Sequence, residues 1–417
     1  MRENKQLEFK ENISTNTYLK TISAFANYDG GKIIFGISDN GVIRGIDNPI
    51  QACLDIENKI NDNIKPMPRY TLDIQDNSTI SLEVYRGQFK PYLYKGKAYK
   101  RNDSSTVEVD RLELNRLILE GNNLSYEEIA SSFQDLTFIE LENELKKVLG
   151  ISFLTEDILR TLDLFTSDMK YNNVAALLSD NNQFIGVDII RFGDTIDEIM
   201  DRETYDNISI LSMLKNSVNM YKKYYQYEKI EETSRTIIDK IPEKAFRETI
   251  ANALVHRLWD VQASIKISMF NDKIEITSPG GLPSGLSKYE YLNGQISLLR
   301  NPILGNLFYR LRYIEKFGTG VLRINNAYDN SILKPEFKVF DNSISIVLPL
   351  TISKELLSTE ELSILNILKN NIKLSRAQIS KTIGLSKDKT IRILNSLIEK
   401  KMIQKSGVGR NTKYYIL

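Results

Sequence analysis

The sequence predicts an α+β protein made of several domains. Its 417 residues exceed what one hydrophobic core normally organises, so two to four domains are expected. Strands and helices alternate over 1–120, helices dominate 121–240, an α/β pattern returns over 241–350, and 353–417 is short and basic. Hydrophobic residues at 41% and charged residues at 26% are typical of a soluble globular chain that packs ordinary cores.

The composition excludes several classes of function. Cys53 is the only cysteine and His256 the only histidine, which rules out an intrachain disulfide and a multi-histidine zinc centre. Metal chemistry would therefore have to use carboxylates and magnesium-like ions. No apolar run reaches the about 18 residues of a membrane span, and the N-terminus lacks the apolar core of a signal peptide. We expect a cytoplasmic protein with no membrane partner.

The first region, 1–120, is expected to alternate short strands and helices. Its clearest strand is Lys32–Ile37, a buried apolar run with turn residues on both sides. The other expected elements are the end of a helix at Ile22–Asn27, a helix at Leu54–Ile64, two strands within Tyr70–Tyr85, and a hairpin at Pro91–Lys100.

The two middle regions differ in pattern. Residues 121–240 are expected to form a mainly helical connector with a strand pair near Ala175–Phe192. In 241–350 a helix at 243–257 should precede four strands, at Ser264–Phe270, Lys273–Thr277, Lys338–Phe340 and Ser343–Leu348.

The last segment, 353–417, hides a basic module within a chain whose net charge is only +1. It holds 13 Lys and Arg residues against 5 Asp and Glu residues, a difference of +8. Ser375 and Gln378 have capping-box spacing at the start of a helix that should end near Gly384. A second helix, capped by Ser386, and strands at Met402–Lys405 and Lys413–Leu417 complete the pattern of a winged helix-turn-helix.

The winged-helix interpretation points to DNA. The second helix would enter the major groove, and the wing tip would reach a phosphate or the minor groove. The alternative is a protein-interaction module whose basic face is merely solvated. The residues expected to contact nucleic acid are Lys387, Lys389, Thr390, Arg392 and Arg410.

A nucleotide site is predicted in 241–350. Glu248 and Asn252 lie four residues apart in the predicted helix and therefore share one face of it. Two glycine clusters follow, Ser278-Pro-Gly-Gly-Leu-Pro283 and Phe317-Gly-Thr-Gly320. Glycines let the backbone approach a bound group and offer its N–H groups to phosphate oxygens. A carboxylate, a carboxamide and two glycine loops together favour a nucleotide as ligand.

Four blocks of this region resemble the GHKL superfamily of ATPases, and more closely its divergent RecG-like branch. The blocks are Arg247-Glu-Thr-Ile-Ala-Asn-Ala-Leu-Val-His256, Ile274-Glu-Ile-Thr-Ser-Pro-Gly-Gly-Leu-Pro283, Ser297-Leu-Leu-Arg-Asn-Pro302 and Ile314-Glu-Lys-Phe-Gly-Thr-Gly-Val321. The resemblance implies ATP as ligand, with Glu248 orienting the hydrolytic water and Asn252 binding Mg²⁺. It also assigns the phosphate and lid contacts to Gly280, Gly281, Gly318, Thr319 and Gly320.

One position departs from that superfamily. GHKL enzymes usually carry an aspartate that accepts a hydrogen bond from the adenine amino group, and the matching residue here is Ser278. A hydroxyl also accepts a hydrogen bond, but more weakly than a carboxylate. The alternative is a degenerate GHKL fold that serves dimerisation or scaffolding.

The first region resembles the AlbA-type domain of the Schlafen family. The resemblance rests on Glu3-x-x-x-x-Glu8-Phe-Lys10, Ser23-Ala-Phe-Ala-Asn27, Gly30-Gly-Lys-Ile-Ile-Phe-Gly-Ile-Ser-Asp39 and Tyr99-Lys-Arg-Asn-Asp-Ser-Ser-Thr106. Bacterial regulators use this domain to bind DNA, and some Schlafens cut RNA with three carboxylates and a divalent metal. By this resemblance the carboxylates are Glu3, Glu8 and Asp39, with Glu8 and Asp39 holding Mg²⁺ or Mn²⁺ beside Lys10. The alternative is a structural Glu8–Lys10 pair and an Asp39 that only serves a turn.

These features together predict a nucleotide-responsive DNA-binding protein of the kind usually labelled a transcriptional regulator. The rival interpretation is a metal-dependent nuclease that acts on RNA, tRNA or DNA in phage defence and is controlled by the ATP-binding domain. A scaffold that binds neither nucleotide nor nucleic acid is the third. By analogy with GHKL and winged-helix proteins, we expect a homo-oligomer.

Overall fold

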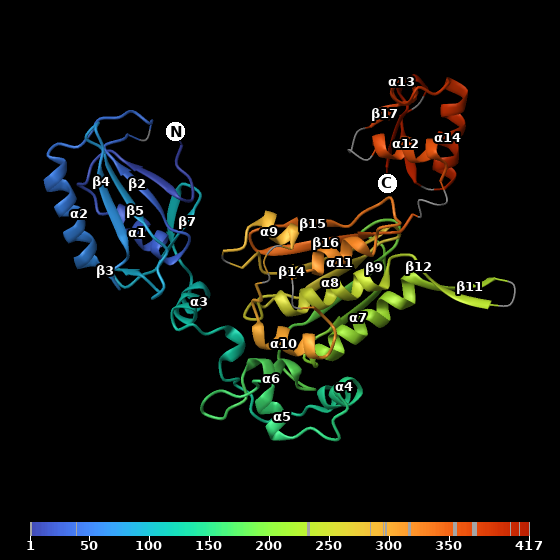
Figure 1. Cartoon of the computed structure of the whole chain (residues 1–417), viewed down its shortest axis with the longest axis horizontal. Coiled ribbons are helices and arrows are strands. Elements are labelled where there is room, and N and C mark those ends of the chain that lie inside the picture. The colour runs from blue at the N-terminus through green and yellow to red at the C-terminus, as the bar shows by residue number, and fades with distance from the viewer. Residues whose placement is uncertain are drawn as a thin grey trace.

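The computed structural model describes residues 2–38, 40–231, 234–283, 285–294, 296, 298–315, 318–352, 357–368, 373–400, 402–407 and 409–416. Figure 1 shows an N-terminal body, a larger central body and a small C-terminal body, with α3 (Arg111–Gly121) lying between the first two. In the described part of the chain, no helix is both long and apolar enough to cross a membrane.

The N-terminal body is built around a sheet with strand order β1-β2-β5-β4. β1 (Leu7–Lys10) runs parallel to β2 (Gly31–Phe35), while β5 (Ile80–Val84) and β4 (Tyr70–Ile74) pair antiparallel. Helix α1 (Tyr18–Asn27) is buried along almost its whole length and confirms the helix end predicted at Ile22–Asn27. Strand β2 confirms the strand predicted at Lys32–Ile37.

Two predictions in this body need correction. Helix α2 (Pro49–Asn63) begins well before the predicted Leu54, because Pro49 suits the first helical position and the Asn48 side chain caps the Gln51 N–H. The hairpin predicted at Pro91–Lys100 is only a tight turn, since β6 (Leu93–Tyr94) pairs with β3 (Ile64–Lys65). The true hairpin follows it, as β7 (Tyr99–Asn102) and β8 (Ser105–Glu108).

The central body is organised by a mixed sheet with strand order β10-β9-β13-β14-β16-β15. Its later strands confirm the predicted pattern: β13 (Ile265–Met269), β14 (Lys273–Pro279), β15 (Glu336–Val339) and β16 (Ser343–Pro349). Helices α7 (Ile210–Tyr225) and α8 (Glu243–His256) pack against the sheet and against each other (Figure 1). The remaining helices are η1 (Tyr126–Glu128), α4 (Ile139–Leu149), α5 (Glu156–Thr161), α6 (Asn173–Leu178), α9 (Lys288–Asn293), α10 (Pro302–Arg310) and α11 (Gly320–Asn326).

The strand pair predicted near Ala175–Phe192 lies later in the chain. Ala175 belongs to α6, and the pair consists of β9 (Val187–Phe192) and β10 (Ile199–Tyr205). β9 also pairs in parallel with β13, so the 121–240 stretch supplies two strands to the sheet of the following region. One buried hydrophobic cluster accordingly runs from Phe138 to Leu348.

Two further units extend from this body (Figure 1). β11 (Gln226–Glu231) and β12 (Ser234–Asp239) form a two-stranded ribbon that projects from the ends of α7 and α8. The C-terminal body contains α12 (Thr359–Leu368), β17 (Leu374–Ser375), α13 (Arg376–Ile383), α14 (Lys387–Glu399), β18 (Ile403–Ser406), η3 (Gly409–Asn411) and β19 (Lys413–Ile416). The predicted caps at Ser375, Gly384 and Ser386 are all present, and the strand order is β17-β19-β18.

Candidate functional site

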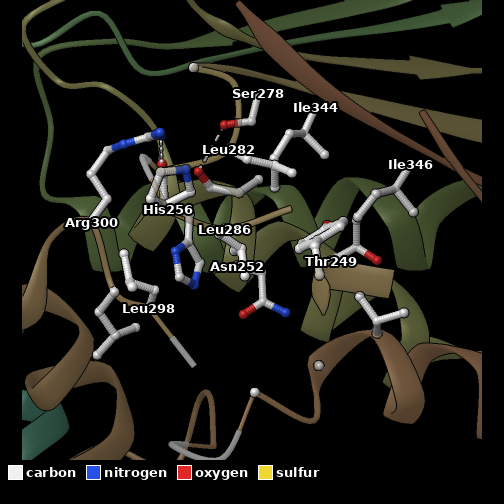
Figure 2. A pocket seen from close by; sticks show the side chains of 18 of the residues that line it. Thr249, Asn252, His256, Ser278, Leu282, Leu286, Leu298, Arg300, Ile344 and Ile346 are labelled. Atoms are coloured by element: carbon white, nitrogen blue, oxygen red, sulfur yellow. Dashed lines mark hydrogen bonds between the residues drawn. The ribbon is translucent and has the colours of Figure 1, made fainter. Parts of the chain in front are cut away.

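A cavity opens between α8, the segment after β14, the segment before α10 and the start of α11 (Figure 2). Its walls are mainly apolar, with Ile276, Ile344 and Ile346 from strands β14 and β16 and Leu282, Leu286 and Leu298 from the segments between β14 and α10. A few polar side chains and glycine backbone segments interrupt these walls, as is usual for a small-molecule site. The polar and glycine positions are Thr249, Asn252, His256, Ser278, Gly280, Gly281, Arg300, Glu315, Gly318 and Gly320.

Helix α8 brings Glu248 and Asn252 together at the edge of this cavity. Asn252 Nδ2 donates a hydrogen bond to Glu248 Oε1 at 3.1 Å, as the shared helix face predicts. Glu248 is only 8% exposed, and this burial raises the pKa of its carboxyl against the opposing effects of Asn252 and Arg323. The carboxylate is thus held by one amide, and Asn252 Oδ1 is left for another partner.

The start of α11 lies directly against this pair. A Cβ on Gly320 would lie 2.7 Å from Asn252 Nδ2 and 3.1 Å from Glu248 Oε1. Gly318, with φ of +66°, lets the chain turn into the helix just before Thr319, its N-terminal cap position. Gly320 of the second glycine cluster therefore lies against the Glu248–Asn252 pair.

The glycines of the first cluster, Gly280 and Gly281, are required by the packing of the backbone. Gly280 has φ of +108°, and its N–H donates to Asn342 O at 2.8 Å. A Cβ on Gly281 would lie 2.2 Å from Asp341 O, in the turn between β15 and β16. Both glycines line the cavity, but packing against this turn already requires them, so their presence alone does not identify a phosphate site.

Ser278, at the position expected to meet the adenine amino group, lies in the cavity wall with 9% exposure. Its hydroxyl donates to Ala253 O at 3.1 Å (Figure 2). Because the proton of the hydroxyl is used in this bond, the lone pairs of the oxygen remain to accept a hydrogen bond.

His256 and Arg300 also line the cavity, although no role there was predicted for either residue. Arg300 Nη1 donates to His256 O at 2.6 Å, and Nη2 donates to Gly281 O at 2.7 Å (Figure 2). Burial and the Arg300 charge lower the pKa of His256 to about 4, so the imidazole is neutral at pH 7. Arg300 belongs to the block Ser297–Pro302, but the carbonyl groups that it binds, those of His256 and Gly281, are distant in sequence, and the block alone does not reveal this role.

An ion pair joins this neighbourhood to α3. Arg116 Nε and Nη2 donate to the two carboxylate oxygens of Asp260 at 2.6 and 2.9 Å. The Asp260 side chain is 10% exposed and that of Arg116 34% exposed. Burial lowers the pKa of Arg300 to about 10, the charge of Arg116 also lowers it, and the charge of Asp260 opposes this shift. The segment after α8 is therefore tied to the helix that follows the N-terminal body.

The N-terminal carboxylates are engaged with other side chains. Glu8 is 4% exposed, pairs with Lys10 Nζ at 2.9 Å and with Arg101, and accepts from Thr21 Oγ1 at 2.7 Å. Glu3 Oε1 accepts from the backbone N–H of Phe9 at 2.8 Å. The expected Glu8–Lys10 pair is thus present, and Arg101 is an additional partner from β7.

The predicted third carboxylate, Asp39, lies outside the described residues. Within the described ranges, no three His, Cys, Asp or Glu side chains come together as a metal-binding group. A metal at Glu8 remains a prediction, and it would have to compete with the cations that already hold this carboxylate.

The candidate nucleic-acid contacts on α14 differ in exposure. Lys387 and Arg392 are exposed, as expected, and Lys389 forms an ion pair with Glu360 of α12. Thr390, predicted to be exposed, is fully buried, and its hydroxyl donates to Ser386 O at 2.9 Å. Thr390 therefore stabilises the start of α14. Arg410 lies in η3, and its side chain is not among those described.

Family comparisons give two domain matches. Residues 3–110 match the model described as "Schlafen, AlbA_2", and residues 262–348 match the one described as "Putative ATP-dependent DNA helicase recG C-terminal". The chain carries a Schlafen AlbA_2 domain and a RecG-like HATPase domain. The second match spans β13 to β16, and with them Ser278 and both glycine clusters, but begins after α8. These domains indicate a nucleic-acid-related function, and the HATPase-like domain suggests ATP binding.

Two solved structures are similar to this chain. The DIP2311 protein from Corynebacterium diphtheriae is 16% identical with a TM-score of 0.49, over 99% of this chain and 92% of that one. The N-terminal domain of a RecG-related protein from Nitrosomonas europaea is 22% identical with a TM-score of 0.18, over 25% and 80% of the two chains. The comparison with curated proteins gave no match.

Proposed function

We propose that this chain is a nucleotide-responsive DNA-binding protein, a transcriptional regulator in which ATP is the effector. The observation that carries the proposal is the cavity in the HATPase-like region, where Gly320 closes on the Glu248–Asn252 pair. The Arg116–Asp260 ion pair supports it further, because it ties the border of that cavity to the helix after the Schlafen domain.

The residues of the cavity suit ATP. The apolar walls would bury the base, and Ser278 Oγ would accept a hydrogen bond from its amino group. Gly318, Thr319 and Gly320 would offer backbone N–H groups to phosphate oxygens. Bound Mg²⁺ would neutralise phosphate charge, and Asn252 Oδ1 is the oxygen that would hold it. Glu248, with its raised pKa, would orient and deprotonate water if the nucleotide is hydrolysed.

The coupling between nucleotide and DNA would run through contacts at the cavity border. Arg300 holds the backbone of His256 and Gly281, so a ligand beside these groups changes the surroundings of Arg300. The charge of Asp260 acts on both Arg300 and Arg116, and Arg116 lies in α3. ATP would shift the relative positions of the domains only as far as its affinity differs between the two arrangements.

The C-terminal body is the proposed DNA reader. Its helices and three-stranded sheet occur in the order expected of a winged helix, with α14 as the recognition helix. The exposed Lys387 and Arg392 are the proposed contacts, and Thr390 is withdrawn because it is buried. Phosphate contacts by such side chains make binding fall with the logarithm of salt concentration.

Two measurements test the regulator. Calorimetric titration with ATP and Mg²⁺ should give binding to the full chain, and fluorescence anisotropy with duplex DNA should give an affinity that changes when ATP is added. Lys387→Glu with Arg392→Glu should lower DNA affinity and the salt dependence, whereas Lys146→Glu, on the distant helix α4, should leave both unchanged. A folded protein that binds no ATP, or DNA binding unaffected by the α14 substitutions, would overturn the proposal.

The nuclease is the rival candidate because the Schlafen AlbA_2 match covers Glu3, Glu8 and Asp39. The contacts of Glu8 with Lys10 and Arg101 argue against it as a free metal ligand. Labelled tRNA, single-stranded DNA and duplex DNA would be incubated with the protein in Mg²⁺ or Mn²⁺. Cleavage that disappears with Asp39→Asn would establish the nuclease, while intact substrates that remain bound would favour the regulator.

A further inference from the structure

The ribbon β11–β12 carries apolar side chains that no other described part of the chain covers. Its strands pair only with each other, through the register Gln226↔Asp239 to Glu231↔Ser234. Ile230 and Ile237 are each 69% exposed and Tyr227 is 48% exposed. A two-stranded ribbon is marginally stable in water unless something packs on it. Because the ribbon projects from the central body (Figure 1), its exposed isoleucines are available to a partner surface.

One face of the ribbon has a distinctive arrangement of four side chains. Glu228 lies opposite Ile237, and Ile230 lies opposite Arg235 in the next row of the same face. The two isoleucines thus occupy one diagonal of a rectangle, and the two charges occupy the other. Glu228 and Arg235 approach each other at 3.5 Å, with side chains 63% and 72% exposed.

The charge of the ribbon disfavours nucleic acid as the partner. Over 226–239 the acidic residues outnumber the basic ones, so a phosphate backbone would be repelled. A partner must instead cover the isoleucines and offer a positive group to Glu228 and a negative group to Arg235. The same face of another ribbon offers all of these.

We propose that a second copy of this chain packs on this face, so that the ribbon is a dimerisation arm. A twofold axis along the Ile230–Ile237 diagonal places each isoleucine against its own copy. The same axis places Glu228 of each chain against Arg235 of the other. Because two residues along a strand span more than the spacing between strands, the strands of the two ribbons then cross at roughly 70°, nearer to the orthogonal than to the aligned packing of sheets. The other twofold axes within this face oppose a charge with an isoleucine or with a like charge.

The root of the ribbon provides additional contact area. Two ribbon faces alone bury less than the about 1,000 Å² of a stable interface. Ile196, Ile199 and Met200 are also exposed, by 69%, 57% and 69%. Ile199 and Met200 directly precede Asp201, which accepts hydrogen bonds from the last turn of α7, the helix that leads into β11. The proposed dimer contact extends from the ribbon to this end of β10.

The root is also fixed to α8. Gln226 Nε2 donates to Asp239 Oδ1 at 2.9 Å and to Glu243 Oε2 at 2.8 Å, and Glu243 lies in the first turn of α8. The arm is thus anchored on the helix that carries Glu248, but its association does not require that the cavity binds a nucleotide.

The first test is sedimentation velocity on the full chain over a wide concentration range without nucleotide. We expect a reversible monomer–dimer equilibrium. Replacing Ile230 and Ile237 by serine should raise the dissociation constant at least tenfold, equivalent to about 1.4 kcal/mol. Ile139→Ser is the matched control, because Ile139 is 67% exposed on α4, far from the ribbon, and should leave the equilibrium unchanged.

The second test uses charge reversal and is specific for two copies of this face. Glu228→Arg makes both charged positions positive, and Arg235→Glu makes both negative, so each variant alone should dimerise more weakly than the wild type. Their equimolar mixture should form a heterodimer at least as tight as the wild-type dimer, because every cross-chain pair is then of opposite charge.

The outcomes separate the alternatives. A chain that stays monomeric at all concentrations overturns the proposal, as does dimerisation that the serine substitutions leave unchanged. A mixture of the two charge variants that associates no better than either alone overturns the proposed twofold arrangement. Melting temperatures measured at concentrations where every variant is monomeric should equal that of the wild type, because the substituted side chains are exposed, whereas at higher concentrations a weaker dimer by itself lowers the melting temperature.

Discussion

Replacing Gly320 by alanine tests the geometry at the centre of the candidate site. The added Cβ would lie 2.7 Å from Asn252 Nδ2 and 3.1 Å from Glu248 Oε1, distances shorter than ordinary van der Waals contact. Both atoms are side-chain ends that can shift, but a shift stretches the 3.1 Å hydrogen bond that joins them. The substitution should therefore displace Asn252 and weaken its bond to Glu248.

Two opposing free-energy terms set the magnitude. Overpacking by one methyl group costs about 1–3 kcal/mol. Alanine in place of glycine at a compatible backbone position stabilises by about 0.4–1 kcal/mol, because the unfolded chain loses conformational freedom. The net cost in the wild-type background should be about 1–2 kcal/mol. In the Asn252→Ala background the nearest obstacle is absent, so Gly320→Ala should be neutral or stabilising by up to about 1 kcal/mol.

Fluorescence of Trp259 is the assay. It is the only tryptophan of the chain, it is 3% exposed, and its indole N–H donates to Leu254 O of α8 at 3.1 Å. Thermal unfolding followed by this signal should give a midpoint about 2–4 °C lower for Gly320→Ala per kcal/mol lost. A midpoint that shifts equally with and without Asn252→Ala would show that Asn252 does not oppose the added Cβ.

Three other predictions concern charged or titratable groups. Arg116→Gln and Asp260→Asn should each destabilise, and a double-mutant cycle by thermal unfolding should give a coupling of about 1–3 kcal/mol, with additive effects contradicting a direct bidentate pair. Below pH 6.5 unfolded His256 takes up a proton that the folded imidazole accepts only near pH 4, so stability should fall by up to about 3 kcal/mol as pH decreases through this window. His256→Gln should reduce the difference in unfolding free energy between pH 4.5 and pH 7, as measured by denaturant titration. An equal difference in the wild type and the variant would contradict the burial of the imidazole. Arg101→Met should lower the calorimetric stability of the N-terminal body by about 1–3 kcal/mol, because Lys10 still pairs with Glu8, and Glu8→Gln in the same background should recover part of it, since the buried carboxylate loses its charge.

Local sequence signals predicted most individual elements of the fold. The capping residues of the C-terminal helices, Ser375 and Ser386, sit where the structure has them, because a cap depends on the next few residues only. β13 and β14 were found from their alternating pattern and the turn between them. Pro49 was missed as a helix start because the first turn of α2 shows little apolar periodicity, with Ile50 69% exposed.

The candidate site was predictable in part. The i, i+4 relation of Glu248 and Asn252 follows from helix geometry and holds in the structure. The roles of Arg300 and His256 were not predicted, because their positions depend on contacts with the distant segments at Gly281 and Asp260. The exposure of individual side chains could not be predicted from the sequence either. Thr390 is a polar residue early in α14, yet its side chain is buried and its hydroxyl donates to Ser386 O at the start of the helix.

Local chemistry is readable from the residues alone: a carboxylate and an amide on one helix face, glycines where backbones approach closely, and a basic module at the end of the chain. Which of these groups meet depends on the fold. It placed β9 and β10 in the same sheet as the HATPase-like strands, because parallel pairing joins residues far apart in sequence. It also engaged Glu8 with Arg101 and left the isoleucines of the β11–β12 ribbon exposed. Burial and long-range pairing depend on the packing of whole elements, which no short stretch of sequence specifies.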